Sequence, residues 1–167
     1  MSWQAPSIAL PLRTRVSSML SVDVSTEITI ARPVAAVAGY AADPANAPEW
    51  YENIDSVEWR TAPPLALGSR VAFVARFLGR TLAYTYEIVE LVRGERLVMR
   101  TAEGPFPMET TYTWAAAGQE ATRMALRNRG RPRGVLRIAA PVVRLGVRRA
   151  NRADLRRLKA LLEARPA

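Results

Sequence analysis

The chain has 167 residues, of which 49% are hydrophobic and 23% charged, and its formal net charge is +9. This length and composition fit one folded domain and exclude a disordered chain. The sequence contains no run of about 18 apolar residues, so it predicts no transmembrane helix. Because the sequence contains no Cys and no His, thiol catalysis, thiolate or imidazole metal sites and a Ser-His-Asp triad are excluded. We expect no metal and no other cofactor.

Positive charge is concentrated at the C-terminal end of the chain. Residues 1–122 carry 10 Arg and 13 acidic residues, a net of −3, whereas residues 123–167 have a net of +12. Such asymmetry is typical of proteins that meet an anionic partner. A solvated helix face explains it as well, because no aromatic residue interleaves with Arg129, Arg131 and Arg133, as binding of single-stranded nucleic acid would favour. We expect at most weak contact of the C-terminal helix with an anionic surface.

Residues 1–21 form an N-terminal extension that we expect to be poorly ordered. Its apolar piece, from Ile8 to Leu12, is too short for a signal peptide, and its positive charges follow that piece instead of preceding it. Met19 is an alternative start for the native protein. We expect a cytoplasmic location.

The folded part is expected to begin with a strand over residues 22–30, where apolar and polar residues alternate. Pro33 suits the first position of a helix, because its missing N–H is not needed there. Asp43-Pro44 should end that helix, since the residue before a proline avoids the α region. A second short helical turn is then predicted from Pro48 to about Ile54.

Six further strands follow, each with alternating apolar and polar residues. They are predicted at residues 56–61, 70–77, 81–91, 97–101, 108–114 and 122–128. Gly79, Gly94 and Gly118 supply turn signals between neighbouring strands. Seven strands with one apolar and one polar face predict an antiparallel sheet that is covered on one side only.

A basic helix, predicted over residues 135–165, should supply that cover. Leu155, Leu158 and Leu162 are spaced i, i+3 and i+7, which places them on one apolar stripe. Pro141 should kink the helix or mark the start of its main segment. The basic residues of its water-facing side are Arg148, Arg152, Arg156 and Lys159.

This order of elements resembles the START-like (SRPBCC) superfamily, in particular its bacterial polyketide cyclase/dehydrase-like branch. The run from Tyr86 to Leu91, the Gly94-Glu95-Arg96-Leu97 turn and the run from Asp154 to Lys159 carry the resemblance, which spans residues 22–165. It implies an α+β helix-grip fold, in which a curved seven-stranded antiparallel sheet wraps round a long C-terminal helix, with two short helices after the first strand. It also implies a cavity between sheet and helix, but no shared set of catalytic residues, so the catalytic residues are left unassigned.

Large side chains on the expected concave face are the candidate ligand contacts. Tyr and Trp combine apolar surface with a polar tip, which suits ringed, partly oxygenated ligands, although each residue could instead simply fill the core. The candidates are Trp50, Phe73, Tyr84, Tyr86, Met99, Met108, Tyr112 and Trp114.

Charged residues near the expected mouth are interpreted as surface groups. Strand parity places Glu109, Arg76 and Arg100 on the outer face of the sheet. The segment from Gly104 to Pro107 is predicted to form a mobile lip over the cavity. The other carboxylates expected at the surface are Asp43, Glu49, Glu52 and Glu103.

The leading functional hypothesis is a binder of a hydrophobic or aromatic small molecule that is polyketide- or lipid-like. One alternative is a cofactor-independent polyketide cyclase or dehydratase in which Tyr84, Tyr86 or Tyr112 polarises a carbonyl. Another is an interaction module that uses the Arg-rich helix on an anionic membrane or nucleic acid. The oligomeric state is left open, with a homodimer as one option.

Overall fold

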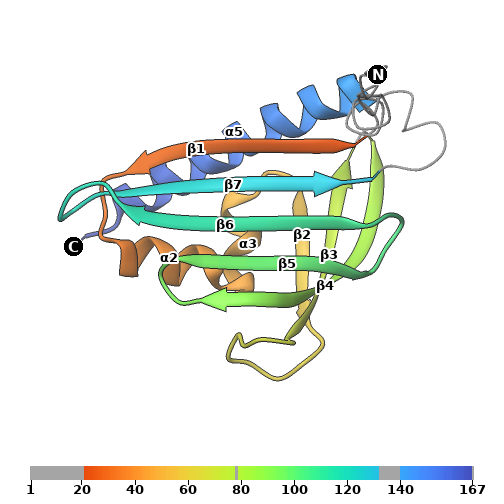
Figure 1. Ribbon diagram of the computed structural model, residues 1–167, viewed down its shortest axis with the longest axis horizontal. Coiled ribbons are helices and arrows are strands. Elements are labelled where there is room, and N and C mark those ends of the chain that lie inside the picture. The colour runs from red at the N-terminus through yellow and green to blue at the C-terminus, as the bar shows by residue number, and fades with distance from the viewer. Residues whose placement is uncertain (1–20, 78, 132–139, 167) are drawn as a thin grey trace, which may run out of the picture.

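The strands form one seven-stranded antiparallel sheet in the order β1-β7-β6-β5-β4-β3-β2, as Figure 1 shows. The computed structural model describes residues 21–77, 79–131 and 140–166, so the predicted disorder of residues 1–20 lies outside the described part. The strands are β1 (Val22–Ile30), β2 (Ile54–Trp59), β3 (Arg70–Phe77), β4 (Arg80–Val92), β5 (Arg96–Glu103), β6 (Met108–Ala116) and β7 (Thr122–Gly130). The α+β helix-grip prediction is confirmed.

The first and last strands of the chain, β1 and β7, lie side by side in the sheet. β1 pairs with β7 over its whole length, from Val22 opposite Gly130 to Ile30 opposite Thr122. Every predicted strand is present. The start of β2 was predicted too late, because the strand begins at Ile54 and its pairing with β3 shifts between Ile54 and Ser56. A bulge of this kind breaks the alternation from which strands are recognised.

The two short helices lie between β1 and β2 and cover one end of the sheet. α2 spans Val34–Ala42, a 3₁₀ turn η1 spans Pro44–Asn46, and α3 spans Ala47–Trp50. The side chain of Asp43 accepts a hydrogen bond from the N–H of Ala45 and so caps η1. The predicted second helix, from Pro48 to about Ile54, is observed as η1 followed by α3, and it ends earlier than predicted because Tyr51 is already extended.

The long helix α5, Ala140–Ala164, packs along the concave side of the sheet beside β1. Leu155, Leu158 and Leu162 are buried against the core, whereas Arg148 and Arg152 are exposed, as predicted. Pro141 lies in the first turn, so of its two predicted roles it marks the start of the described helix. The predicted helical residues 135–139 lie outside the described part.

Ion pairs cover the outer face of the sheet. Arg100 bonds to Glu109 at 2.7 Å, and Arg76 bonds to Asp55 at 2.9 Å, so these arginines and Glu109 point away from the cavity as predicted. Exposed pairs of this kind contribute about 0–1 kcal/mol each. Among the described residues, no helix is long and apolar enough to cross a membrane, and no group of three or more acidic side chains could hold a metal ion.

Candidate functional site

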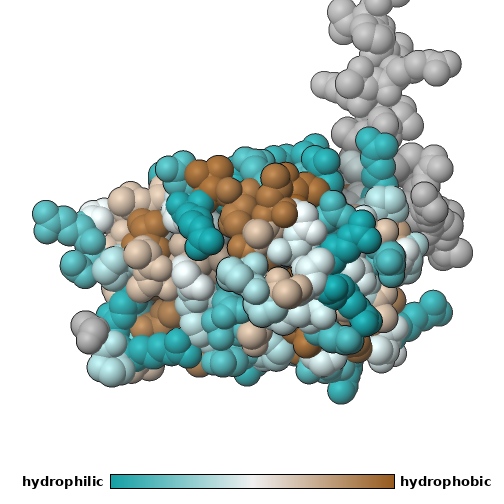
Figure 2. Space-filling view, turned by 90° about the horizontal axis from the view of Figure 1, so that it is seen from below, coloured by the Kyte–Doolittle hydropathy of each residue, from teal (hydrophilic) through white to brown (hydrophobic). Residues whose placement is uncertain are grey.

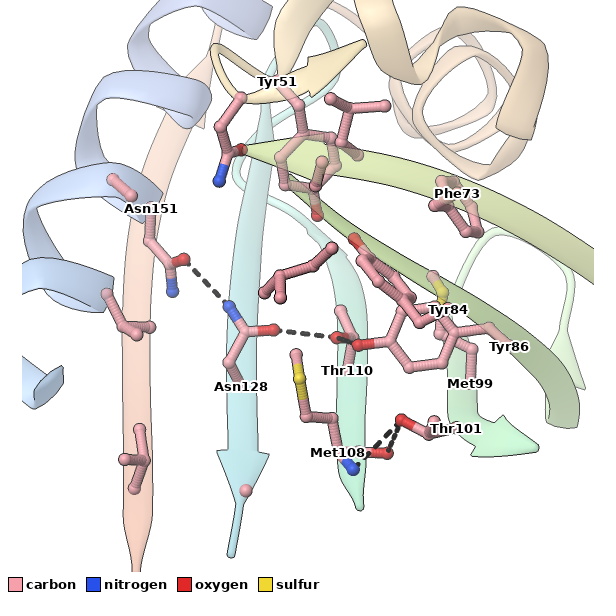
Figure 3. Close-up of a pocket in the computed structure, with 18 of the residues that line it drawn as sticks. Tyr51, Phe73, Tyr84, Tyr86, Met99, Thr101, Met108, Thr110, Asn128 and Asn151 are labelled. Atoms are coloured by element: carbon pink, nitrogen blue, oxygen red, sulfur yellow. Dashed lines mark hydrogen bonds between the residues drawn. The ribbon is translucent and has the colours of Figure 1, made fainter. Parts of the chain in front are cut away.

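A cavity of about 160 Å³ lies between the concave face of the sheet and α5. Side chains from β3 to β7 form one wall, and Val143, Val147 and Ala150 of α5 form part of the other. Figure 3 shows Tyr51 at one end of the cavity and Met108 toward the other. The predicted lip contributes Pro105 and Phe106 to the border. Most of the lining is apolar or aromatic, so a ligand would be largely dehydrated on entry.

Six of the eight predicted contact residues border this cavity, and they all come from the strand faces expected to point inward. Three aromatic rings on β3 and β4 form a continuous wall. The rings of Phe73 and Tyr84 are stacked with centroids 5.8 Å apart, and Tyr84 meets Tyr86 edge to face at 5.2 Å. The six residues are Phe73, Tyr84, Tyr86, Met99, Met108 and Tyr112.

The two predicted tryptophans lie elsewhere. Trp50 is fully buried in α3, with its ring 3.9 Å from that of Tyr51. Trp114 lies two residues beyond Tyr112 on the same face of β6, past the end of the cavity and on the strand that α2 contacts. It borders a different hollow of about 680 Å³ on the surface, between α2, the loop after β2 and the β4–β5 turn. Figure 2, seen from below, shows apolar side chains gathered among hydrophilic ones on that side of the molecule.

Two tyrosines share a hydrogen bond at one end of the cavity. The hydroxyl groups of Tyr51 and Tyr112 are 2.6 Å apart. Burial is the main reason that the pKa of each phenol is raised above its ordinary value. Both groups therefore remain protonated at neutral pH, and each already has a partner.

A chain of hydrogen bonds crosses the cavity wall from β4 to α5, as the dashed lines in Figure 3 show in part. The hydroxyl groups of Tyr86 and Thr110 are 3.1 Å apart. Thr110 donates to Oδ1 of Asn128 at 2.8 Å, and Nδ2 of Asn128 donates to Oδ1 of Asn151 at 2.8 Å. Because Thr110 gives its proton to Asn128, Tyr86 is the donor to Thr110.

The chain of bonds ends on a buried donor without a partner. Asn151 is only 3% exposed, and its Nδ2 has no hydrogen-bond partner among the described residues. An unpaired buried polar group costs on the order of 1–3 kcal/mol. A bound molecule with a suitably placed acceptor would recover that cost.

Asp154 follows one turn later on α5 and also borders the cavity. It is 2% exposed, and its Oδ1 accepts the backbone N–H of Glu52 at 2.9 Å. Burial raises the pKa of this carboxyl from 3.8 to about 6; the hydrogen bond from Glu52 lowers it, the charge of Glu52 raises it and that of Arg157 lowers it. Asp154 can therefore exchange a proton near neutral pH.

The sequence patterns did not predict that Asn151, Asp154 and Tyr51 border the cavity. Asn151 and Asp154 lie four and seven residues after Val147, within the apolar stripe that faces the sheet. Polar residues at such positions are the available signal, because buried polar groups are rare unless they are paired or functional. Tyr51 carried no comparable signal, since it lies in the irregular connection after α3.

The fold and the cavity define the class, and comparison with known proteins gives the family. Residues 21–163 match the family described as polyketide cyclase / dehydrase and lipid transport, so the chain belongs to that family. A comparison with curated proteins found no match.

Several solved structures share the fold. TTHA0849 from Thermus thermophilus is 20% identical, with a TM-score of 0.74 and coverage of 85% of this chain and 97% of that one. The Zhui aromatase/cyclase from a Streptomyces species is 19% identical, with a TM-score of 0.72 and coverage of 86% and 94%. A START superfamily protein from Mycobacterium smegmatis is 12% identical, with a TM-score of 0.71 and coverage of 84% and 97%.

Proposed function

We propose that this protein binds a hydrophobic, ring-containing small molecule in the cavity between the sheet and α5. The observation that carries the proposal is the aromatic wall of Phe73, Tyr84 and Tyr86, which borders the cavity instead of filling it. Flat aromatic walls favour flat, ringed ligands through offset and edge-to-face contacts.

The size of the cavity and the family support this class of ligand. A cavity of about 150 Å³ lined by apolar side chains is known to accept benzene, and the space found here is of similar size. The family description combines polyketide chemistry with lipid transport, and one structural neighbour is an aromatase/cyclase. A polyketide-like or lipid-like ligand agrees with both.

Native mass spectrometry of freshly purified protein tests the proposal. We expect the protein to retain a small molecule, or to take up one equivalent of added α-methylstyrene, a compact aromatic hydrocarbon. Protein that arrives empty and takes up none of the hydrocarbon would contradict the proposal.

A second candidate is a cofactor-independent cyclase or dehydratase, and Asp154 is the observation that favours it. Its pKa of about 6 suits proton transfer near neutral pH. Of the three tyrosines considered, Tyr84 alone has a hydroxyl without a hydrogen bond to another described residue, since Tyr86 bonds Thr110 and Tyr112 bonds Tyr51. As a carboxylate, Asp154 would accept a proton from the carbon beside a ligand carbonyl, and Tyr84 would donate a hydrogen bond to the enolate oxygen.

Hydrogen–deuterium exchange of the methyl group of acetophenone distinguishes an enzyme from a binder. In D₂O, an enzyme of this kind would accelerate exchange, and the variant Asp154→Asn would lose the acceleration while still binding the ketone. Equal exchange rates with and without protein would leave the binder as the function.

A further inference from the structure

The unpartnered amide of Asn151 deepens the proposed function. We infer that the cavity selects an uncharged ligand with a carbonyl oxygen, which accepts a hydrogen bond from Nδ2 of Asn151 while the ring of the ligand lies on the wall of Phe73, Tyr84 and Tyr86. This inference rests on the proposed function, because it needs a ligand in the cavity. It adds the polarity of that ligand and its orientation.

A hydrogen bond from Asn128 on β7 occupies the side-chain oxygen of Asn151. Tyr86 has Thr110 as its partner, Thr110 donates to Asn128, and Asn128 donates to Oδ1 of Asn151. With Oδ1 occupied as an acceptor, the group left over is the N–H donor. Three strands and the helix therefore position a donor for an acceptor atom that the described part of the protein does not supply.

The charges around the cavity favour an uncharged acceptor over a carboxylate. Asp154 is the acidic residue of the lining, and it lies one helical turn from Asn151. Arg129 is the only cation among the described lining residues, and its guanidinium pairs with Glu109 and Asp23 on the outer face. Among the described lining residues, a ligand carboxylate beside Asn151 would thus meet a carboxyl group and no free cation, whereas a ketone, quinone or ester carbonyl meets a donor.

The positions of the two walls set the orientation of the ligand. The aromatic wall comes from β3 and β4, and Asn151 comes from α5 on the opposite side, as Figure 3 shows. A molecule with a ring at one end and a carbonyl at the other can satisfy both walls at once. Its apolar edge then faces Met99 and Met108, which also border the cavity.

Three probes of closely matched shape test the inference on the wild-type protein. Acetophenone carries the carbonyl, α-methylstyrene replaces it with a methylene group, and benzoate replaces the methyl ketone with a carboxylate. We expect the first two to bind and benzoate not to bind. The stretching frequency of an isotope-labelled acetophenone carbonyl should fall on binding relative to its value in an alkane, since a hydrogen bond weakens the C=O bond.

Two variants identify the donor. In Asn151→Leu, which removes the free N–H and puts no other donor in its place, acetophenone should bind about three- to tenfold more weakly, the net worth of one hydrogen bond. The frequency shift should vanish and α-methylstyrene should bind as before. In Tyr84→Phe the shift should persist. If Asn151→Leu does not fold, the side-chain N–H resonances of Asn151 in the wild type decide, because acetophenone should move them and α-methylstyrene should not.

The outcomes separate the two proposals. An unshifted carbonyl frequency, a shift lost in Tyr84→Phe, side-chain N–H resonances that respond equally to both probes, or tight binding of benzoate would overturn the inference and leave the cavity as a binding site. If neither acetophenone nor α-methylstyrene binds, the proposed function fails, and the inference fails with it.

Discussion

Replacing Asp154 with Asn should stabilise the protein at high pH and do little at low pH. The carboxyl is buried at 2% exposure, and its pKa is raised from 3.8 to about 6. Above pH 6 the group is ionised in both the folded and the unfolded state, and its burial as a charge opposes folding. Below pH 4 it is protonated in both states, so this penalty disappears. The contribution of Asp154 to stability is therefore greatest in acid and is lost as the pH rises through 6.

The shift of about two pKa units sets the size of the effect, since each unit corresponds to about 1.4 kcal/mol. Asp154→Asn should thus gain up to about 3 kcal/mol at pH 8, because Asn keeps an oxygen that can accept the N–H of Glu52. Urea denaturation of wild type and variant between pH 4 and pH 8 measures the difference directly. Glu120→Gln, which removes an exposed carboxylate from the β6–β7 turn, is the control and should show no such trend. A loss of stability at pH 8, or the same gain at both ends of the range, would refute the reasoning.

Three further predictions concern stability. Tyr51→Phe and Tyr112→Phe should each lower the free energy of unfolding by about 1–3 kcal/mol, because each leaves the other hydroxyl unpaired. In a double-mutant cycle, the double variant should lose less stability than the sum of the two single losses; strict additivity would show that the bond is absent. Gly104→Ala should destabilise the fold by about 1–3 kcal/mol, because the added Cβ would lie 2.9 Å from the side chain of Thr101. Gly39→Ala, where the added Cβ enters open space on α2, should stabilise the fold slightly. Equal effects of the two substitutions on the free energy of unfolding would contradict this. Arg148→Glu should change the free energy of unfolding by no more than about 0.5 kcal/mol and leave α-methylstyrene binding intact, and a larger change would show that this exposed side chain has a structural role.

The sequence was most informative where the spacing of apolar residues indicates which face of a strand or helix is buried. Alternation along β3 and β4 placed Phe73, Tyr84 and Tyr86 on the inner face, and the structure has them there. The i, i+3, i+7 spacing of leucines identified the side of α5 that faces the sheet. Both patterns reflect the transfer of apolar groups from water, which is a property of each residue and its neighbours in the chain.

The features missed from the sequence depend on contacts between distant residues. The alternation of side chains along β6 could not show that Trp114 lies near α2 instead of in the cavity. Alternation gives the face of the sheet to which a side chain points, but not how far along the strand the cavity extends. The hydrogen bonds that link Thr110, Asn128 and Asn151 join two strands and a helix, so no local sequence pattern predicts them. Likewise, the contact between Asp154 and the N–H of Glu52 spans 102 residues of sequence.

Filling the cavity tests the central claim most directly. Ala150 borders the cavity on α5, whereas Ala160 lies exposed on the same helix, so Ala150→Trp and Ala160→Trp add the same side chain inside and outside the site. Titration with α-methylstyrene, followed by NMR, should show saturable binding to the wild type and to Ala160→Trp and no binding to a folded Ala150→Trp. Undiminished binding to Ala150→Trp would contradict the account, because it would place the ligand outside the cavity between the sheet and α5.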